Sequence, residues 1–409
     1  MADGELDRMD EGQEKKKPRK NSPWFWIILA AAGVAFWYWT GRPSKLWKVE
    51  LGGPAICQAA VSYEAVYVCA GSSLRVFDSV TGREMWKFSR SDYPYMVGPP
   101  VVIGRNVFVW SSKLHSLGRE TGDEMWQELS QEVFCPAGED IVYGGWHSVI
   151  ARDAATGRDR WTVSLDKTKT VEGIAVYDNT VLVGYSEDAV PSAAAGRSPG
   201  GAGGVEAWDS KAKVRLWTAD LGTAIKHSPV KIGEIVFAVD NGLRFRSLIA
   251  FDTASQQVSW QAKSGRLILP ELANVSTQVT DQAIGTVTQP AAFRTSVIAG
   301  FSDEYGDVVK CFDFQTGELT WRYEIDWEIC PQKTKDQPKS ALTTPVVSGK
   351  SVYFGAGPYL VKLNAGTGRE KWRFKTESGG FIRHAPAVMN GIVYFGSDKG
   401  DFYAVSTGD

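Results

Sequence analysis

The strongest constraint on the fold is a short unit that recurs along the chain. An Asp or Asn stands eight residues before a Trp at six places: Asp78–Trp86, Asp153–Trp161, Asp209–Trp217, Asp252–Trp260, Asp313–Trp321 and Asn364–Trp372. A seventh copy, Gly118–Trp126, has Gly in place of the Asp. A Thr-Gly pair lies inside five of the seven copies and is replaced in KAKVRLW (211–217) and ASQQVSW (254–260). A fixed period of this kind indicates repeated structural units.

Each copy follows an alternating, strand-like run, and several of these runs follow a second strand that begins with Pro, such as PVVIGRN (100–106). The unit therefore predicts four strands, A to D. Asp starts the turn between C and D by hydrogen-bonding its own backbone, and Gly accepts the positive φ of that turn. Trp on strand D fills the wedge between neighbouring units. Such repeats are typical of a β-propeller.

The count of repeats predicts how the ring closes. There are eight strand B segments but only seven copies of the Trp unit. FYAVSTGD (402–409) supplies a strand C without a strand D, whereas KLWKVEL (45–51) has a Trp and strand alternation but no preceding strands. We therefore predict an all-β, eight-bladed propeller closed by its N-terminal strand, which removes exposed sheet edges. The predicted blade-docking residues are Trp47, Trp86, Trp126, Trp161, Trp217, Trp260, Trp321 and Trp372.

The N-terminal residues form a separate module in this interpretation. Residues 1–22 are polar and predict a disordered cytoplasmic tail. Residues 23–40, PWFWIILAAAGVAFWYWT, predict one transmembrane signal-anchor helix with aromatic residues at both interfaces, so residues 24–40 contact the membrane. The basic run KKKPRK (15–20) keeps the tail inside, which places the propeller of residues 41–409 in the periplasm of a bacterial inner-membrane, single-pass protein. A cleaved signal peptide is the alternative, because LAAAGVA offers small residues.

Composition excludes several functions. The net charge of −2 argues against nucleic-acid binding. The five Cys contain no C-x-x-C pair and the four His have no metal-ligand spacing, so we assign no catalytic, cofactor-binding or metal residue and expect no cofactor. Cys57 with Cys69, and Cys311 with Cys330, form disulfides in one interpretation and remain buried thiols in the other.

The segments VYFGSDKGDFYAVS and NAGTGREKWRF resemble the repeat of the pyrroloquinoline-quinone (PQQ)-like eight-bladed propellers, over residues 45–409. One branch of that family is the quinoprotein alcohol dehydrogenases, which hold PQQ against a disulfide between adjacent cysteines and use Ca²⁺. The other branch is BamB, a non-enzymatic propeller of the outer-membrane β-barrel assembly machinery. No two cysteines are adjacent here and no carboxylate-amide cluster stands out as a hard-cation site.

The resemblance therefore implies a non-enzymatic, BamB-like scaffold. We expect a monomeric propeller that binds protein partners in an envelope complex, in outer-membrane protein assembly or another complex. A PQQ- and Ca²⁺-dependent quinoprotein dehydrogenase is one alternative. An envelope sensor that signals through the N-terminal tail is the other.

Long connections predict where a partner binds. The three longest are residues 186–204 between strands B and C, and residues 264–289 and 325–343 between successive units. These connections belong on the same face of a propeller, and long loops of compact folds are often functional. The candidate partner residues are Arg266, Leu267, Leu269 and Glu271 in RLILPEL, and Lys226, His227, Arg383 and His384 at the rim of the axial channel. The alternatives are a lid formed by RLILPEL, and solvated rim residues.

Overall fold

The computed structural model describes residues 42–55, 57–90, 95–129, 133–187, 202–225, 227–240, 246–264, 286–302, 306–326 and 342–408. Residues 43–408 form one compact unit. The predicted tail (1–22) and anchor helix (23–40) lie outside the described residues. Within the described ranges, the structure contains no helix with the length and apolar character needed to span a membrane.

The first four sheets are four-stranded and antiparallel. Blade 1 contains β2 (Ala60–Val61), β3 (Ala65–Ala70), β4 (Ser73–Asp78) and β5 (Glu84–Ser89). Blade 2 contains β6 (Val97–Ile103), β7 (Asn106–Trp110), β8 (Leu114–Gly118) and β9 (Glu124–Glu128). Blade 3 contains β10 (Phe134–Ala137), β11 (Asp140–Gly145), β12 (Ser148–Asp153) and β13 (Asp159–Ser164). Blade 4 contains β14 (Lys169–Tyr177), β15 (Thr180–Glu187), β16 (Gly203–Asp209) and β17 (Val214–Asp220).

The remaining sheets repeat the pattern, with an interrupted first strand in blade 6. Blade 5 contains β18 (Val230–Ile232), β19 (Ile235–Asp240), β20 (Arg246–Asp252) and β21 (Gln257–Ser264). Blade 6 contains β22 (Thr286–Val287), β23 (Ala291–Phe293), β24 (Ser296–Ser302), β25 (Asp307–Asp313) and β26 (Leu319–Glu324). Blade 7 contains β27 (Val346–Ser348), β28 (Ser351–Ala356), β29 (Tyr359–Asn364) and β30 (Glu370–Lys375). Blade 8 contains β31 (Ala387–Met389), β32 (Ile392–Gly396), β33 (Asp401–Ser406) and β1 (Lys45–Glu50).

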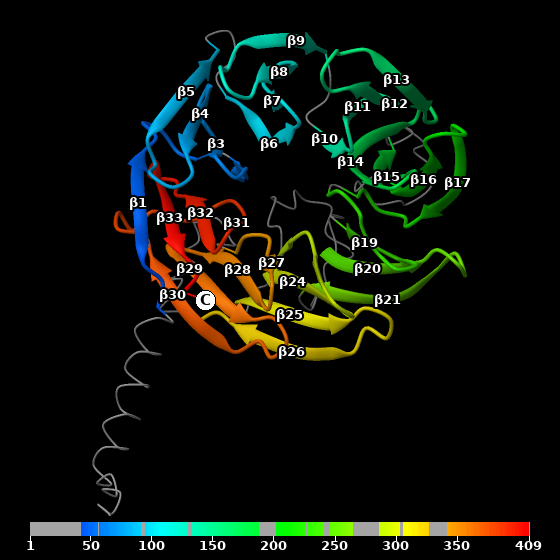
Figure 1. Ribbon diagram of the computed structural model, residues 1–409. Helices are drawn as coiled ribbons and strands as arrows, with labels where there is room; N and C mark the ends of the chain where they lie inside the picture. Colours follow the sequence, from blue (N-terminus) through cyan, green and yellow to red (C-terminus); the bar gives the residue numbers. More distant parts are fainter. Residues whose placement is uncertain are drawn as a thin grey trace, which may run out of the picture. The chain divides into compact units, whose positions relative to one another are not determined.

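The eight sheets stand around a common axis, and the ring is visible in Figure 1. Within each blade the strands pair in the order A, B, C, D. The A strands of neighbouring blades contact one another near the axis, whereas the D strands form the outer rim. The predicted all-β, eight-bladed propeller is therefore confirmed.

Each of the eight repeat Trp residues lies on an outer D strand. In six of them the indole N–H donates a hydrogen bond to the next blade. The acceptor is always the carbonyl of the residue after the Asp position, just beyond strand C. These bonds join Trp47 to Ser79 (3.1 Å), Trp86 to Arg119 (3.0 Å), Trp126 to Ala154 (3.2 Å), Trp260 to Phe314 (3.1 Å), Trp321 to Ala365 (2.9 Å) and Trp372 to Thr407 (3.0 Å). These six Trp residues thus hydrogen-bond each blade to the backbone of the next blade.

The Gly of the repeated Thr-Gly pair has a second role besides its positive φ. A β-carbon on Gly122, where φ is 77°, would lie 2.5 Å from the indole of Trp86 in the preceding blade. Lys213 (φ 57°) and Gln256 (φ 55°) occupy the Gly position in the two degraded copies. These two turns face Trp161 and Trp217, whose indole N–H groups have no hydrogen-bond acceptor among the described residues.

The N-terminal strand closes the ring. β1 pairs antiparallel with β33, with Trp47 opposite Ala404, and the two strands lie side by side in Figure 1 as blue and red arrows. Trp47 is 8% exposed, and its ring packs against Phe402 and Tyr394 of its own blade and Phe77 of blade 1. The predicted pairing of the first strand with the last blade is therefore observed.

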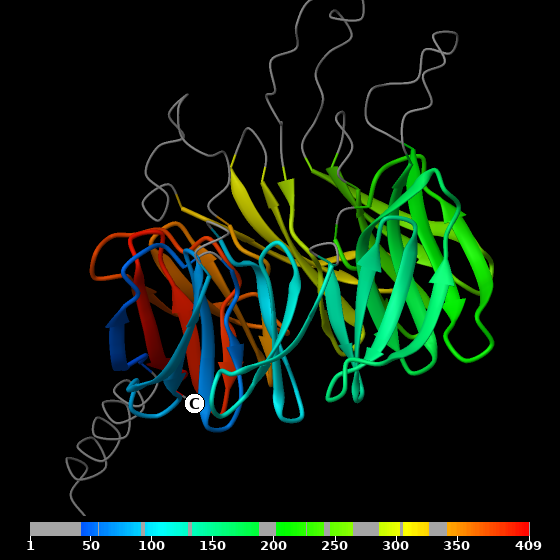
Figure 2. The ribbon, with the colours of Figure 1, turned by 90° about the horizontal axis from the view of Figure 1, so that it is seen from above.

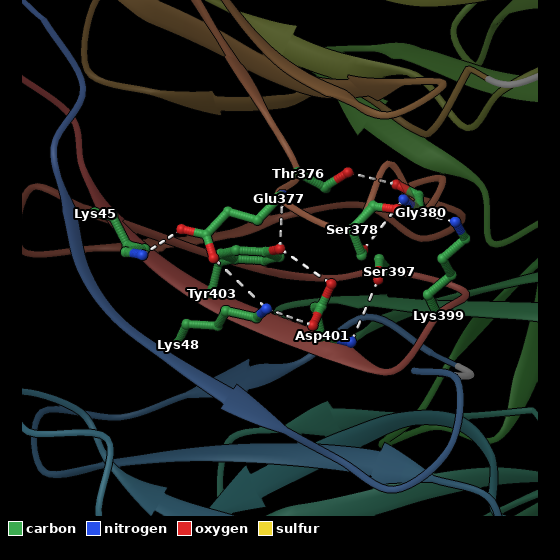
Figure 3. A network of polar contacts seen from close by, with 10 residues as sticks. All are labelled: Lys45, Lys48, Thr376, Glu377, Ser378, Gly380, Ser397, Lys399, Asp401 and Tyr403. Atoms are coloured by element: carbon green, nitrogen blue, oxygen red, sulfur yellow. Dashed lines mark hydrogen bonds and ion pairs between the residues drawn. The ribbon is translucent and has the colours of Figure 1, made fainter.

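Charged side chains join the closing strand to the connection between blades 7 and 8 (Figure 3). The Lys48 ammonium lies 2.8 Å from Asp401 and 3.6 Å from Glu377, which Lys45 also contacts. The hydroxyl of Tyr403 accepts the backbone N–H of Glu377 at 3.0 Å and donates to Asp401 at 3.1 Å. We call these five residues the seam network.

The seam network shifts the titration of its two acids. The hydrogen bond from Lys45 lowers the pKa of Glu377. Burial by itself would raise the pKa of Asp401, but hydrogen bonds from Lys48, Ser378 and Tyr403 lower the pKa overall. Both acids are therefore charged near pH 7 and attract the lysines of β1. Exposed ion pairs contribute little singly, so the network matters as a set.

Candidate functional site

The antiparallel order of each blade defines two faces of the ring. The A–B and C–D turns lie on one face, which we call the turn face. The B–C and D–A connections lie on the other, which we call the loop face. Residues 188–201, 265–285 and 327–341 lie outside the described residues, but the strands that border them, including β15, β21 and β26, end at the loop face, on the upper side in Figure 2.

Five of the eight candidate partner residues have no described structure. Arg266, Leu267, Leu269, Glu271 and Lys226 all lie outside the described residues. Their assignment to a partner site therefore stays a prediction.

The other three candidates lie just before the innermost strands. Burial, followed by the charge of Arg246, lowers the pKa of His227. Burial, followed by the charge of Arg383, lowers the pKa of His384. Both histidines are therefore neutral near pH 7, and the Arg383 guanidinium is itself paired with Asp398 at 3.1 Å. These positions give the rim much less positive charge than the sequence suggested.

The described part of the loop face instead exposes three large apolar side chains. Tyr95 follows β5, Leu129 follows β9, and Trp146 joins β11 to β12 with 75% of its surface exposed. They occupy successive connections of blades 1 to 3. Trp146 is not one of the eight Trp residues that the repeat requires. A Trp without a role in the repeat is the sequence feature that could have pointed to this position. Exposed aromatic side chains on one face are typical of interaction surfaces.

One buried polar group has the connectivity of a hydrolytic relay. The hydroxyl of Ser111 is 2.9 Å from His115 Nε2, and His115 Nδ1 is 2.6 Å from Glu124. A nucleophilic serine needs this order of contacts. Ser111 is only 1% exposed and His115 is fully buried between blades 1 and 2, so no substrate reaches the hydroxyl. The group has the role of a polar contact within the core.

A second buried group lies in blade 4, on the side that packs against blade 3. The fully buried carboxylate of Glu206 accepts hydrogen bonds from Lys169 (2.7 Å), Trp208 (3.0 Å) and Arg215 (3.2 Å). Desolvation alone would lower the pKa of Lys169, but its hydrogen bond to Glu206 raises the pKa overall. Because the ion pair is fully hydrogen-bonded, it is a structural element and not a reactive one.

Within the described ranges, no three His, Cys, Asp or Glu side chains gather closely enough to hold a metal ion. The four described cysteines, Cys57, Cys69, Cys135 and Cys311, are free thiols and none is adjacent to another in sequence.

Cys57 and Cys69 nevertheless meet in the core between blades 1 and 2. A hydrogen bond with Cys57, together with burial, favours the neutral thiol and raises the pKa of Cys69 well above its usual value. The structure thus shows the first predicted pair as neighbouring thiols. Cys330, the partner predicted for Cys311, lies outside the described residues.

Eight antiparallel blades, each with a Trp on its outer strand, define the chain as a PQQ-like repeat β-propeller. The family model described as outer membrane protein assembly factor BamB matches residues 147–409. The chain belongs to this family.

Solved structures share the fold at low sequence identity. BamB from Moraxella catarrhalis superposes with a TM-score of 0.60 and 17% identity, covering 89% of this chain and 98% of that one. A quinohemoprotein alcohol dehydrogenase from Pseudomonas putida gives a TM-score of 0.60 and 11% identity, covering 90% of this chain and 76% of that one. At these identities the similarity shows the fold alone.

A curated relative is the serine/threonine-protein kinase AfsK of Streptomyces griseus, with 28% identity over 172 residues. The match covers 38% of this chain and 20% of the kinase, so the chain matches about a fifth of that relative's length.

Proposed function

We propose that this protein is a non-enzymatic scaffold that binds protein partners through its loop face. In this proposal residues 24–40 anchor it in the bacterial inner membrane and the propeller lies in the periplasm. It serves an envelope complex, as in outer-membrane protein assembly. It acts as a monomeric propeller within that complex, without a cofactor.

The loop face is the observation that carries the proposal. The three longest connections leave from it, and Tyr95, Leu129 and Trp146 expose apolar surface beside shorter connections of the same face. Apolar side chains presented by a rigid scaffold are the usual energetic centres of protein interfaces. Family membership adds support, because the matching family model bears the name of an outer membrane assembly factor.

A cross-linking experiment on the full-length protein in its own membranes tests the proposal. The native protein is compared with a triple variant, Tyr95→Ser, Leu129→Ser and Trp146→Ser, and with a control, Met125→Ser, whose exposed side chain lies on outer strand β9. We expect the native protein and the control to capture the same envelope proteins and the triple variant to lose them. Equal capture by all three would refute the loop-face assignment.

The dehydrogenase is the alternative that a specific observation favours, because the propeller also superposes on a quinohemoprotein alcohol dehydrogenase. Its prediction is simple. Purified protein supplied with PQQ and Ca²⁺ would reduce an artificial electron acceptor with alcohols. We expect no reduction above that of a heat-denatured sample. Turnover that depends on both PQQ and Ca²⁺ would refute the proposal of a non-enzymatic scaffold and support the dehydrogenase.

A further inference from the structure

The chain enters the propeller on the turn face. β1 runs antiparallel to β33, so Lys45 lies beside Val405, at the C-terminal end of β33, on the face where the C–D turns of the other blades lie. The backbone N–H of Ser406 donates to Ser44 at 2.9 Å, which fixes the residue before β1 at the same end. Ser44 and the start of β1 therefore lie on the turn face, opposite the loop face.

Two exposed apolar side chains lie beside this entry point. Tyr63, in the A–B turn of blade 1, is 79% exposed, and Val80, in the C–D turn of the same blade, is 70% exposed. Ser79 connects them to the closing strand, because its hydroxyl donates to the carbonyl of Tyr63 at 2.8 Å and its own carbonyl accepts the indole N–H of Trp47 at 3.1 Å. Tyr63 and Val80 together are called the entry patch.

The other blades are an internal control for the entry patch. The residue at the Tyr63 position is polar or Gly in all seven of them: Gly104, Gly138, Asp178, Gly233, Arg294, Gly349 and Asn390. The residue at the Val80 position is polar, Ala or Gly: Glu120, Ala155, Lys211, Ala254, Gln315, Gly366 and Gly408. Turn chemistry favours such residues, since neither turn needs a large apolar side chain. Both exceptions fall in the blade that receives Trp47 of the closing strand.

We propose that the entry patch contacts the headgroup region of the phospholipid bilayer that holds residues 24–40. This inference rests on the proposed membrane anchor. Four residues, 41–44, separate residue 40 from Lys45, and the five steps from one α-carbon to the next span at most about 18 Å. That distance keeps the turn face close to the bilayer surface. Tyr is favoured at a membrane interface because its ring is apolar and its hydroxyl remains hydrated.

This orientation also gives the two faces different binding roles, the turn face toward lipid and the loop face toward protein partners. With the turn face against the bilayer, the loop face with its long connections and exposed Trp146 points into the periplasm, where protein partners have access.

A lipid-quenching experiment tests the proposal on the full-length protein in vesicles of phosphatidylethanolamine and phosphatidylglycerol. An environment-sensitive fluorophore is attached at Val80→Cys or, as the matched control, at Ala155→Cys, the same turn position two blades away. The background carries Cys330→Ser, because the described cysteines are largely buried and the label should report one site. Vesicles contain a headgroup nitroxide lipid, and flotation measures membrane attachment separately.

We expect the protein to float with the vesicles and the position-80 probe to lose several-fold more fluorescence than the position-155 probe. Flotation with equal quenching at both positions would overturn the entry patch while leaving the anchor in place. Failure to float would overturn both proposals. If the position-80 probe is instead shielded from aqueous iodide without vesicles, and only while residues 1–41 are present, those residues cover the patch and the bilayer contact is wrong.

Discussion

Trp47→Ala tests the closure of the ring most directly. Trp47 is almost fully buried between blade 8 and blade 1. Burial of about 200 Å² of indole surface at about 25 cal/mol per Å² corresponds to about 5 kcal/mol, close to the 3–5 kcal/mol typical of Trp-to-Ala changes in cores. The lost hydrogen bond adds little, because the Ser79 carbonyl still accepts the hydroxyl of Tyr394 at 3.1 Å. We expect the free energy of unfolding to fall by about 4–5 kcal/mol.

The matched control is Trp217→Ala. Trp217 occupies the same strand position in blade 4, but it faces Gln256 in place of Gly and its indole has no hydrogen-bond acceptor among the described residues. Trp217 is also more exposed, so its removal should cost about half as much. The measurement is guanidinium unfolding of the full-length protein in detergent, followed by near-ultraviolet circular dichroism, with the slope compared between variants.

Hydrogen exchange identifies where the loss occurs. In Trp47→Ala the amides of β33 and β1 should exchange faster than those of blade 4, because the seam opens locally before the ring unfolds. An unchanged unfolding midpoint, or equal losses for the two Trp variants, would refute the idea that Trp47 closes the ring.

Three further predictions follow from the structure. Gly122→Ala should destabilise the protein by clearly more than the about 1–2 kcal/mol that a left-handed backbone costs, because the new methyl group overlaps Trp86. Oxidation with diamide should link Cys57 to Cys69, while the other two described cysteines stay reduced in a mass-spectrometric thiol assay, because only the first two are neighbours. Acid should weaken the seam network, because folding lowers the pKa of Glu377 and of Asp401 below the ordinary values of 4.5 and 3.8. The stability that these two carboxylates contribute is fully present above the ordinary pKa values, and it is lost as the pH falls through the lowered pKa values of the folded protein.

Each of these has an internal control. Gly104→Ala has the same kind of positive φ but open space at its β-carbon, so it should show the left-handed cost alone, and an equal loss in both Gly variants would contradict the Trp contact. Cys57→Ser should abolish the diamide product, and a product that persists would indicate another pair. For the seam, Lys48→Met should lower the urea midpoint more at pH 7 than at pH 2, because urea does not screen ion pairs as a salt does. A difference that stays constant with pH would show that the acids do not act through Lys48.

The repeat was predictable from sequence because its signals are local. Asp at the start of a turn, Gly at positive φ and a Trp eight residues after the Asp lie within one strand pair and recur often enough to count. The pairing of β1 with β33 was also predictable, because the count of complete units left one Trp over. The anchor helix, the tail and the candidate residues in RLILPEL remain predictions, because they lie outside the described residues.

The loop-face site was only partly predictable. The topology of a propeller places the long connections on one face, so that face was identified. The charge of His227 and His384 was not predictable, because their lowered pKa values come mainly from burial, which depends on the tertiary structure. Trp146 was visible as a surplus Trp, but nothing local shows that it is exposed.

The sequence by itself determined the number of blades, the order of strands and the closure by the N-terminal strand, since turn chemistry and strand alternation act over a few residues. Only the tertiary structure decided that each repeat Gly lies against the Trp of the preceding blade, that two thiols meet in the core between blades 1 and 2, and that Tyr63 and Val80 lie where the chain enters the ring. Those residues are distant in sequence or lie on separate turns, so they come close to one another only when the blades have packed into the closed ring.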